Sequence, residues 1–402
     1  MFEIIDRDVN DTIIKVIGVG GAGGNAVEHM IREGVGGVDF ICCNTDAQAL
    51  KNSSAGVKLQ LGPGLGAGGK PERAREHARN EREHIAEILR GAHMCFITAG
   101  MGGGTGTGAA PIIAEVAREL GILTVAVVTK PFMFEGRRGK IAEEGLAELS
   151  QHVDSLIVIL NEKLMEVLGE DVSMLEAFHA ADNVLTNAVG GISEIINVPG
   201  LVNVDFEDVR TVMGEMGKAM MGSASASGVD RARLAAEQAV ASPLLEGIEL
   251  SGAKGVLVNI TASASLGLKE YQEVMNTIHT YTAPEATVIC GAVFDDSMED
   301  QLRVTVVATG LGTKVARQPK IVYSEGRGQR TGTYDMPPSP TAVATEPAAG
   351  VMNIAGSNTS AGSLDDFFTP NPRGGRDSRA RDMSDTGMDK YDIPAFLRKQ
   401  AD

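Results

Sequence analysis

The sequence lacks several features that whole classes of protein need. Its 402 residues include no tryptophan, and aromatic residues make up only 4%. The only cysteines are Cys42, Cys43, Cys95 and Cys290, and their spacing matches neither a metal site nor a redox pair. We therefore expect core thiols in a reducing compartment and no metal held by protein side chains. No apolar run reaches the roughly 20 residues of a membrane span, and no signal peptide is recognisable, so a cytoplasmic protein without membrane insertion is expected.

Positive charge is also scarce. The chain has 36 Lys and Arg against 53 Asp and Glu, a net charge of -17, whereas a nucleic-acid-binding protein would present a basic face. We therefore expect no nucleic-acid partner. The P-loop signature is missing too, because Gly69-Lys70 is followed by Pro71 and Gly139-Lys140 by Ile141.

Glycine, with 49 residues, is abundant and is concentrated in three loops. The densest loop covers residues 100–108, between a short apolar run at 94–99 and a helical pattern over 109–117 with Pro111 near its start. Strand, glycine loop and helix in this order direct backbone N–H groups and the positive end of a helix dipole at an anion. The pattern predicts a phosphate-binding site.

The two other glycine loops have similar surroundings. The apolar run 12–19 leads into a glycine-rich helix start, with Gly18, Gly20 and Gly23 at GxGxxG spacing, which is a weak signal for dinucleotide binding. The loop 62–69 precedes a charged helix expected from about Pro71 to Arg90.

Strand and helix patterns alternate through the first half of the chain. Strands are expected at 12–19, 38–43, 94–99, 123–129 and 155–160. This alternation predicts an α/β fold, a Rossmann-like parallel sheet with ligands beyond the carboxyl ends of its strands. Asn44, Glu135 and Asn161 fall at that edge, as do the glycine loops.

The longest helical pattern runs from Ser173 to Val198. Ser173 and Glu176 form a capping signature, and Pro199-Gly200 would close the helix. Shortly after it, Asp205 and Asp208 stand three residues apart. From these residues alone, N-terminal capping is the favoured interpretation, and a pair of functional carboxylates on one side is the alternative.

The rest of the chain predicts a smaller α/β domain and a tail. Strands are expected at 219–225, 255–262, 287–293 and 302–309, with helices at 229–241 and 268–281. The composition then shifts to Gly, Ser, Thr, Pro and Arg, which predicts disorder. The expected organisation is a nucleotide-binding domain at 1–172, a central helix and connector at 173–202, a C-terminal domain at 203–316, a disordered linker at 317–388 and a partner-binding peptide at 389–402.

Taken together, these features resemble the FtsZ family of the tubulin superfamily, the bacterial cell-division GTPases. The most specific segments are Gly102-Gly103-Gly104-Thr105-Gly106-Thr107-Gly108 and Asn203-Val204-Asp205-Phe206-Glu207-Asp208. The resemblance implies a GTP-hydrolysing, filament-forming protein of the cytoplasmic division ring, at mid-cell beneath the inner membrane.

The resemblance also implies a nucleotide site. The GTP or GDP phosphates would be held by Gly21, Ala22, Gly23, Gly24 and Asn25 and by Gly104, Thr105 and Gly106, with Gly68 and Gly69 near the γ-phosphate and Asn44 at the same edge. Glu135, an arginine and Asn161 would hold the ribose, Phe178 would stack on guanine and Asp182 would accept from its N1 and N2 donors. Mg²⁺ would be bound through the phosphates. The family places the arginine where this chain has Gly139, so Arg138 or Lys140 is expected to substitute.

In the family, the active site is completed by the next subunit of a head-to-tail filament. Asn203, Asp205 and Asp208 would act on the neighbour's nucleotide, and residues 389–399 would bind membrane adaptors and ring regulators. Two alternatives stay open. One is a nucleotide-binding filament protein without turnover. The other is an NAD-dependent oxidoreductase, suggested by the GxGxxG spacing.

Overall fold

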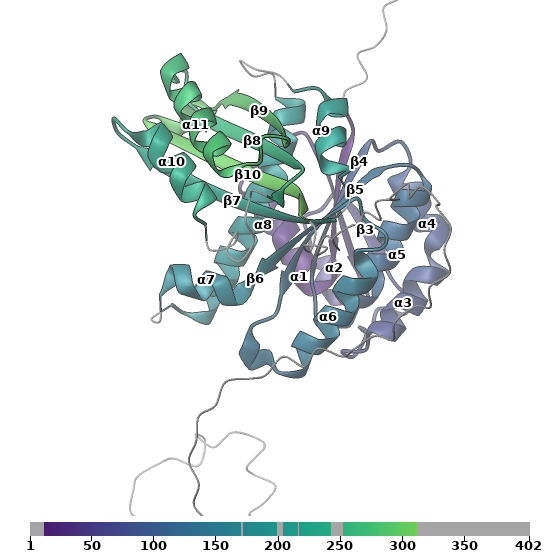
Figure 1. The fold of residues 1–402 in the computed structure, drawn as a ribbon. Coiled ribbons are helices and arrows are strands. Elements are labelled where there is room, and N and C mark those ends of the chain that lie inside the picture. The colour runs from purple at the N-terminus through teal and green to yellow at the C-terminus, as the bar shows by residue number, and fades with distance from the viewer. Residues whose placement is uncertain (1–11, 170–171, 199–203, 216, 243–251, 312–402) are drawn as a thin grey trace, which may run out of the picture. The chain divides into compact units, whose positions relative to one another are not determined.

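The computed structural model describes residues 12–169, 172–198, 204–215, 217–242 and 252–311. In chain order the first half consists of β1 (Ile14–Val19), α1 (Gly20–Arg32), β2 (Asp39–Asn44), α2 (Ala47–Lys51), β3 (Val57–Gln60), α3 (Pro71–Asn80), α4 (Arg82–Leu89), β4 (Met94–Gly100), α5 (Thr105–Glu119), β5 (Leu123–Lys130), the 3₁₀ helix η1 (Met133–Glu135), α6 (Arg137–Leu149), β6 (Ser155–Leu160) and α7 (Asn161–Leu168). The second half consists of α8 (Met174–Asn197), α9 (Phe206–Met213), β7 (Gly217–Ser227), α10 (Arg231–Val240), β8 (Gly255–Ala262), α11 (Leu268–Tyr281), β9 (Thr287–Phe294), η4 (Asp296–Met298) and β10 (Gln301–Leu311). Figure 1 labels these elements on the ribbon.

All the strands belong to one ten-stranded sheet in the order β3-β2-β1-β4-β5-β6-β7-β10-β8-β9. The strands from β3 to β6 are parallel, and β10 runs antiparallel to both β7 and β8. The two halves join where β6 pairs with β7, from Ser155 opposite Gly217 to Ile157 opposite Ala219. The predicted α/β class with a parallel sheet is confirmed. The proposed domain boundaries stay a prediction.

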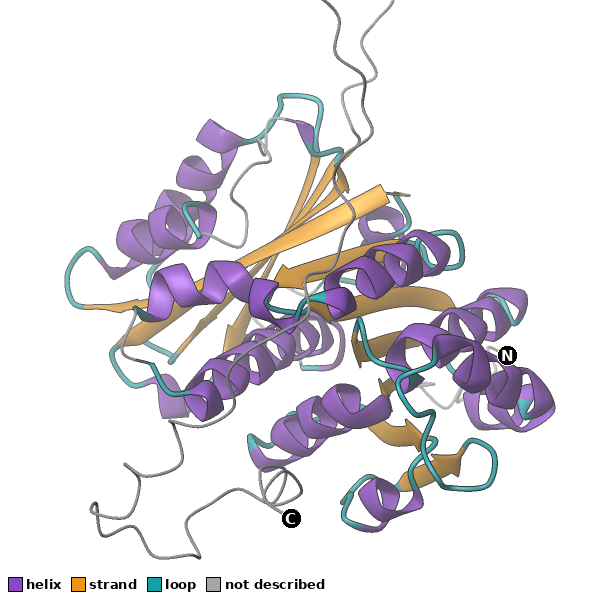
Figure 2. Ribbon diagram, turned by 90° about the horizontal axis from the view of Figure 1, so that it is seen from below, coloured by secondary structure: helices purple, strands orange, loops and turns teal. Residues whose placement is uncertain are grey.

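Helices cover both faces of this sheet (Figure 2). One buried cluster lies under α1 and α8, a second lies under α4 and α5, and a third lies between α10 and α11 and strands β8 and β10. Because a strand covered on both faces buries nearly all of its side chains, β4 is apolar from Met94 to Ala99 except at Thr98, which is also buried. Cys42, Cys43 and Cys95 are buried free thiols, and burial raises the pKa of Cys95 to about 12, so the expectation of core thiols is met.

Two local expectations were wrong. α5 begins at Thr105, inside the glycine run, so Pro111 lies in the helix interior and not near its start. Gly106 and Gly108 lie in α5, and α3 packs closely on the second of them: a Cβ atom on Gly108 would lie only 2.0 Å from the carbonyl oxygen of Pro71. The single helix expected over 71–90 is two helices, α3 and α4, separated at Glu81.

The long helix matches its prediction closely. The Ser173 hydroxyl accepts from the backbone N of Glu176 at 3.2 Å, and the Glu176 carboxylate accepts from the backbone N of Ser173 at 2.9 Å. At the other end, Asn197 Nδ2 donates to the carbonyl oxygen of Gly37 at 2.6 Å. Pro199-Gly200, the linker and the terminal peptide lie outside the described residues. None of the described helices is both long and apolar enough to cross a membrane.

Candidate functional site

The three glycine loops meet at the carboxyl edge of the parallel strands. A Cβ atom on Gly20 would lie 3.0 Å from the backbone N of Gly106, and one on Gly104 would lie 2.8 Å from the Ala67 side chain. Side chains other than hydrogen would therefore push the loops apart. The hydroxyls of Thr45 and Thr105 add a 2.7 Å hydrogen bond between the end of β2 and the start of α5. The three loops therefore lie against one another, and their use as one nucleotide site stays a prediction.

Within the first loop, neighbouring glycines have different roles. A Cβ atom on Gly23 would lie 2.3 Å from the carbonyl oxygen of Thr98, and one on Gly18 would lie 2.4 Å from that of Gly23. These two glycines allow α1 to pack against the sheet. Gly21 and Gly24 have no atom within 4 Å of the same position, so their backbone is open on the side where a ligand would approach.

The loop before α3 has the backbone of an anion cradle. Gly68 and Gly69 both adopt positive φ, at +62° and +70°. Residues with a Cβ atom adopt this conformation only at an energetic cost, and successive N–H groups in such turns often form an anion-binding concavity. The loop lies against the start of α5, since a Cβ atom on Gly104 would be 3.0 Å from the backbone N of Lys70.

The predicted ribose residues follow β5 and β6. Glu135 Oε1 accepts from the backbone N of Phe132 at 3.0 Å, and Glu135 Oε2 pairs with the Arg138 guanidinium. Arg138 Nε also donates to the carbonyl oxygen of Gly102 at 3.4 Å, which favours Arg138 over Lys140 as the substitute arginine. Asn161 is 5% exposed, and its Oδ1 has no partner among the described residues. A buried oxygen without a partner fits a site that a polar ligand completes.

The predicted guanine residues lie on α8, one helical turn apart. Phe178 remains 43% exposed, and its ring packs edge to face on Phe132 at 5.8 Å. Burial raises the pKa of Asp182 to about 6, partly offset by the nearby His29 and His179. The Asp182 carboxyl group therefore changes between its protonated and ionised forms near pH 6 when no nucleotide is bound.

Sequence reasoning missed several neighbours of this site. His29 Nε2 lies 2.5 Å from Asn183 Oδ1, and the rings of His29 and His179 are 6.2 Å apart. His29 stands four residues after Asn25 on α1, so helical spacing from the glycine loop could have indicated it. Thr45 directly follows Asn44 in the sequence, but its bond to Thr105 depends on the fold.

The two described acids of the predicted catalytic loop lie at the opposite edge of the sheet. Asp205 is the N-cap of α9, and its Oδ1 accepts from the backbone N of Asp208 at 2.8 Å, so the capping interpretation is confirmed. The Phe206 ring lies 6.1 Å from that of His93, immediately before β4, whereas the main glycine loop follows β4. Seven residues of strand span roughly 23 Å. Asp205 and Asp208 are exposed, and Asn203 lies outside the described residues.

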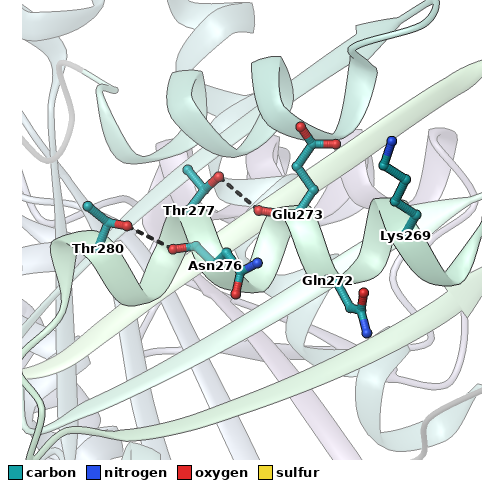
Figure 3. A pocket seen from close by; sticks show the side chains of 6 residues that line it. All are labelled: Lys269, Gln272, Glu273, Asn276, Thr277 and Thr280. Carbon is teal, nitrogen blue, oxygen red and sulfur yellow. Dashed lines mark hydrogen bonds between the residues drawn. The ribbon is translucent and has the colours of Figure 1, made fainter.

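Two cavities accompany these features. One, of about 160 Å³, lies beside α1 and shares Gly21, Gly24, Asn25 and Asn44 with the predicted nucleotide site. The other, of about 450 Å³, lies along α11 and is lined by Lys269, Gln272, Glu273, Asn276, Thr277 and Thr280 (Figure 3). Both of its threonines donate to carbonyl oxygens of their own helix, so their O–H groups are already used as donors. In the described part of the chain, no three His, Cys, Asp or Glu side chains are grouped as metal ligands.

Comparison with known proteins agrees with this geometry. Residues 13–169 match the family model described as "Tubulin/FtsZ family, GTPase domain", and residues 217–312 match "FtsZ family, C-terminal domain". The chain is 53% identical to the cell division protein FtsZ of Pseudomonas aeruginosa and 52% identical to that of Pseudomonas putida, over 100% of both chains in each case.

Solved structures show the same fold. An empty FtsZ dimer from M. jannaschii is 44% identical with a TM-score of 0.72, covering 75% of this chain and 88% of that one. A CetZ2 protofilament from Haloferax volcanii with GTPγS bound shares the fold alone, at 21% identity and a TM-score of 0.62, over 74% of this chain and 93% of that one. These comparisons give no support to the oxidoreductase alternative. The glycine loops, the long helix that links them to the acid-bearing loop, and matches along both halves lead to one conclusion: this chain belongs to the FtsZ family of tubulin-related GTPases.

Proposed function

We propose that this protein hydrolyses GTP at the seam between successive subunits of a filament that serves bacterial cell division. One observation carries the proposal: the glycine loops and the acid-bearing start of α9 lie at opposite ends of β4. A span of roughly 23 Å separates these ends, so one chain cannot bring both to the same phosphate. A second copy stacked head to tail can.

The residues of one chain suffice to bind and orient the nucleotide. Backbone N–H groups at the starts of α1 and α5 would face the phosphates, with the positive helix ends adding favourable charge. Asp182 would accept from the two adjacent donors of guanine, which adenine lacks at those positions. Mg²⁺ bound to the phosphates would offset negative charge that the backbone amides alone cannot.

The neighbour would supply the groups that act on water. Asp205 and Asp208 are exposed carboxylates, and Asn203 stands beside them in sequence. Together they would orient a water molecule toward the γ-phosphate, since phosphoryl transfer depends mainly on positioning and on electrostatic stabilisation. Capping by Asp205 does not compete with this role: Oδ1 accepts from the backbone, and the second carboxylate oxygen remains available.

A head-to-tail contact between unlike faces generates a filament rather than a closed dimer. The M. jannaschii dimer and the CetZ2 protofilament are relatives that self-associate by description, which supports this assembly. We place the filament in the cytoplasm, at a mid-cell ring beneath the inner membrane. Residues 389–399 would bind adaptor and regulatory proteins there, because a short apolar peptide on a long tether suits partner capture.

The test is GTP hydrolysis per molecule measured against protein concentration. We expect specific activity to collapse below a threshold concentration, because dilute protein has no neighbour to complete the site. Activity per molecule that is constant on dilution would refute the proposal. If filaments form but GTP is not consumed at any concentration, the protein is a nucleotide-binding polymer without turnover.

Two substitutions at Asp205 separate its capping role from catalysis. Asparagine caps a helix as well as aspartate but carries no charge, whereas Asp205→Ala removes both functions and costs about 0.5–2 kcal/mol of stability. We expect Asp205→Asn to melt like the wild type and bind GTP normally, yet to lose hydrolysis as fully as Asp205→Ala. Normal hydrolysis in Asp205→Asn would assign the residue to capping alone.

A further inference from the structure

Arg231, at the start of α10, is a nearly buried charge that the proposed function does not use. It is 4% exposed. Its Nε and Nη2 donate to the two carboxylate oxygens of Glu270 at 2.7 and 3.1 Å, in the paired geometry that a guanidinium favours. Nη2 also donates to the Ser265 hydroxyl at 3.1 Å, and Nη1 donates to the carbonyl oxygen of Asp300 at 3.0 Å.

These partners come from three separate connections. Arg231 follows the turn after β7, Ser265 and Glu270 lie between β8 and the first turn of α11, and Asp300 precedes β10. Further bonds reinforce the junction: Asp300 accepts from the backbone N of Gly228 at 3.2 Å, and Glu270 accepts from that of Gly267 at 2.8 Å. The guanidinium therefore fixes the relative positions of three loops at the carboxyl ends of β7, β8 and β9.

The acid-bearing end of α9 points toward this same end of the sheet. Val204 lies near Gly291 in the middle of β9, and Val212 lies near Gly255 at the start of β8. Because β8 and β9 are parallel, these two contacts show that α9 runs in the direction opposite to both strands. Its N-terminus therefore faces their carboxyl ends. We call the start of α9 and the three joined loops, residues 228–230, 263–268 and 295–300, the tail face.

The tail face has the character of an interface. Val229 is 100% exposed and Leu268 is 76% exposed, each two residues from a member of the Arg231–Glu270 pair. Large exposed apolar residues that gather in one region indicate a binding surface. Asp230, Asp296, Glu299 and Asp300 make this face acidic, and all four are exposed.

The rim of the nucleotide site complements it. Leu65, Met133 and Phe134 are 88%, 80% and 65% exposed, and they stand in the loops around the predicted phosphates and ribose. Lys70, Arg73, Arg137, Arg138 and Lys140 make this rim basic, and all five are exposed. Apolar residues on both faces and opposite charges point to a second copy of this chain as the occupant of the tail face.

We propose that Arg231 is a positioning residue for assembly: it holds the three loops of the tail face in the geometry that receives the nucleotide rim of the next subunit. The proposal rests on the head-to-tail function above, and it adds Arg231 as the residue that fixes the shape of the tail face. A buried ion pair adds little net stability compared with apolar packing. We therefore attribute the Arg231–Glu270 pair to the geometry of the loops rather than to the stability of the fold.

The first test is Arg231→Lys, which keeps the charge but loses the paired geometry. Arg233→Lys, two residues further along α10, is the matched control, because Arg233 is exposed and its ion pairs among the described residues are with Asp230 and Glu237. We expect Arg231→Lys to bind GTP like the wild type when dilute and to raise the threshold concentration for hydrolysis about five- to thirtyfold. An unchanged threshold in a variant that binds GTP would overturn the proposal. If Arg231→Lys does not fold, Ser265→Ala removes a single bond to the same guanidinium, and an unchanged threshold there would count equally against the proposal.

Mixing separates a defect of the tail face from a general loss of fold. A Gly24→Ala partner would have an impaired nucleotide site and an intact tail face. At a concentration where neither variant alone hydrolyses GTP, an equal mixture should recover turnover, because the nucleotide site of Arg231→Lys would receive the partner's tail face. No recovery would refute the positioning role. Wild-type activity that is independent of concentration would instead refute the head-to-tail function itself.

Discussion

Adjacent glycines on α1 allow a stringent test of the nucleotide site. A Cβ atom on Gly24 meets nothing within 4 Å, whereas one on Gly23 would lie 2.3 Å from the carbonyl oxygen of Thr98. Alanine at a helical glycine normally raises stability, here by about 0.5–1 kcal/mol for Gly24→Ala. The same change at Gly23 overpacks the helix against the sheet and should lower stability by about 1–3 kcal/mol.

Gly24→Ala should weaken GTP binding even though it raises the stability of the protein. If the open side of Gly24 faces the phosphates, the new methyl group occupies their space, and a loss of about 1–3 kcal/mol corresponds to roughly 5- to 150-fold weaker GTP binding. Gly24→Ala should therefore be more stable than wild type without nucleotide, yet bind GTP less well.

The assay combines thermal melting of nucleotide-free protein with titration of GTP into dilute protein. Gly36→Ala is the control, because Gly36 is also open, has no positive φ and stands in the α1–β2 connection away from the glycine loops. Unchanged GTP affinity in Gly24→Ala would refute the assignment of this face to the phosphates. Equal melting of Gly23→Ala and wild type would refute the packing argument.

Two further predictions concern the half-buried carboxylates of α8, Asp182 and Glu194. Because the pKa of Asp182 is raised to about 6, its carboxylate is protonated below that pH, and GTP affinity should fall about tenfold per pH unit below 6. Asp182→Asn should remove this pH dependence of GTP affinity. A pH profile that is unchanged in Asp182→Asn would exclude Asp182 as its source. Glu194 accepts from Asn259 at 3.1 Å and pairs with Arg303 at 3.4 Å, so Glu194→Ala should lower the free energy of unfolding in urea by roughly 1–3 kcal/mol. The exposed Glu237→Ala should change it little, and equal effects of the two substitutions would contradict the proposed link between α8 and the second half of the sheet.

The sequence by itself determined the periodic parts of the fold. Apolar runs marked the strands, because a strand covered on both faces buries nearly all of its side chains, as in β4, where Thr98 is the one polar residue between Met94 and Ala99. Ser173 and Glu176 marked the start of α8, because a capping box is a local signature. The glycine loops indicated phosphate binding because this signal is local too: strand, loop and helix are consecutive in the chain.

The tertiary structure decided what depends on contacts between distant segments. Gly23 and Gly24 look alike in the sequence, and only the position of Thr98 distinguishes a packing glycine from an open one. The glycines after β4 resemble a loop, yet Gly106 and Gly108 belong to α5, and only the closeness of Pro71 shows why position 108 has no room for a side chain. The placement of Asp205 at the far edge from the glycine loops also depends on the path of α8 across the sheet. Local patterns record which conformation a segment prefers, and packing alone determines which segments meet.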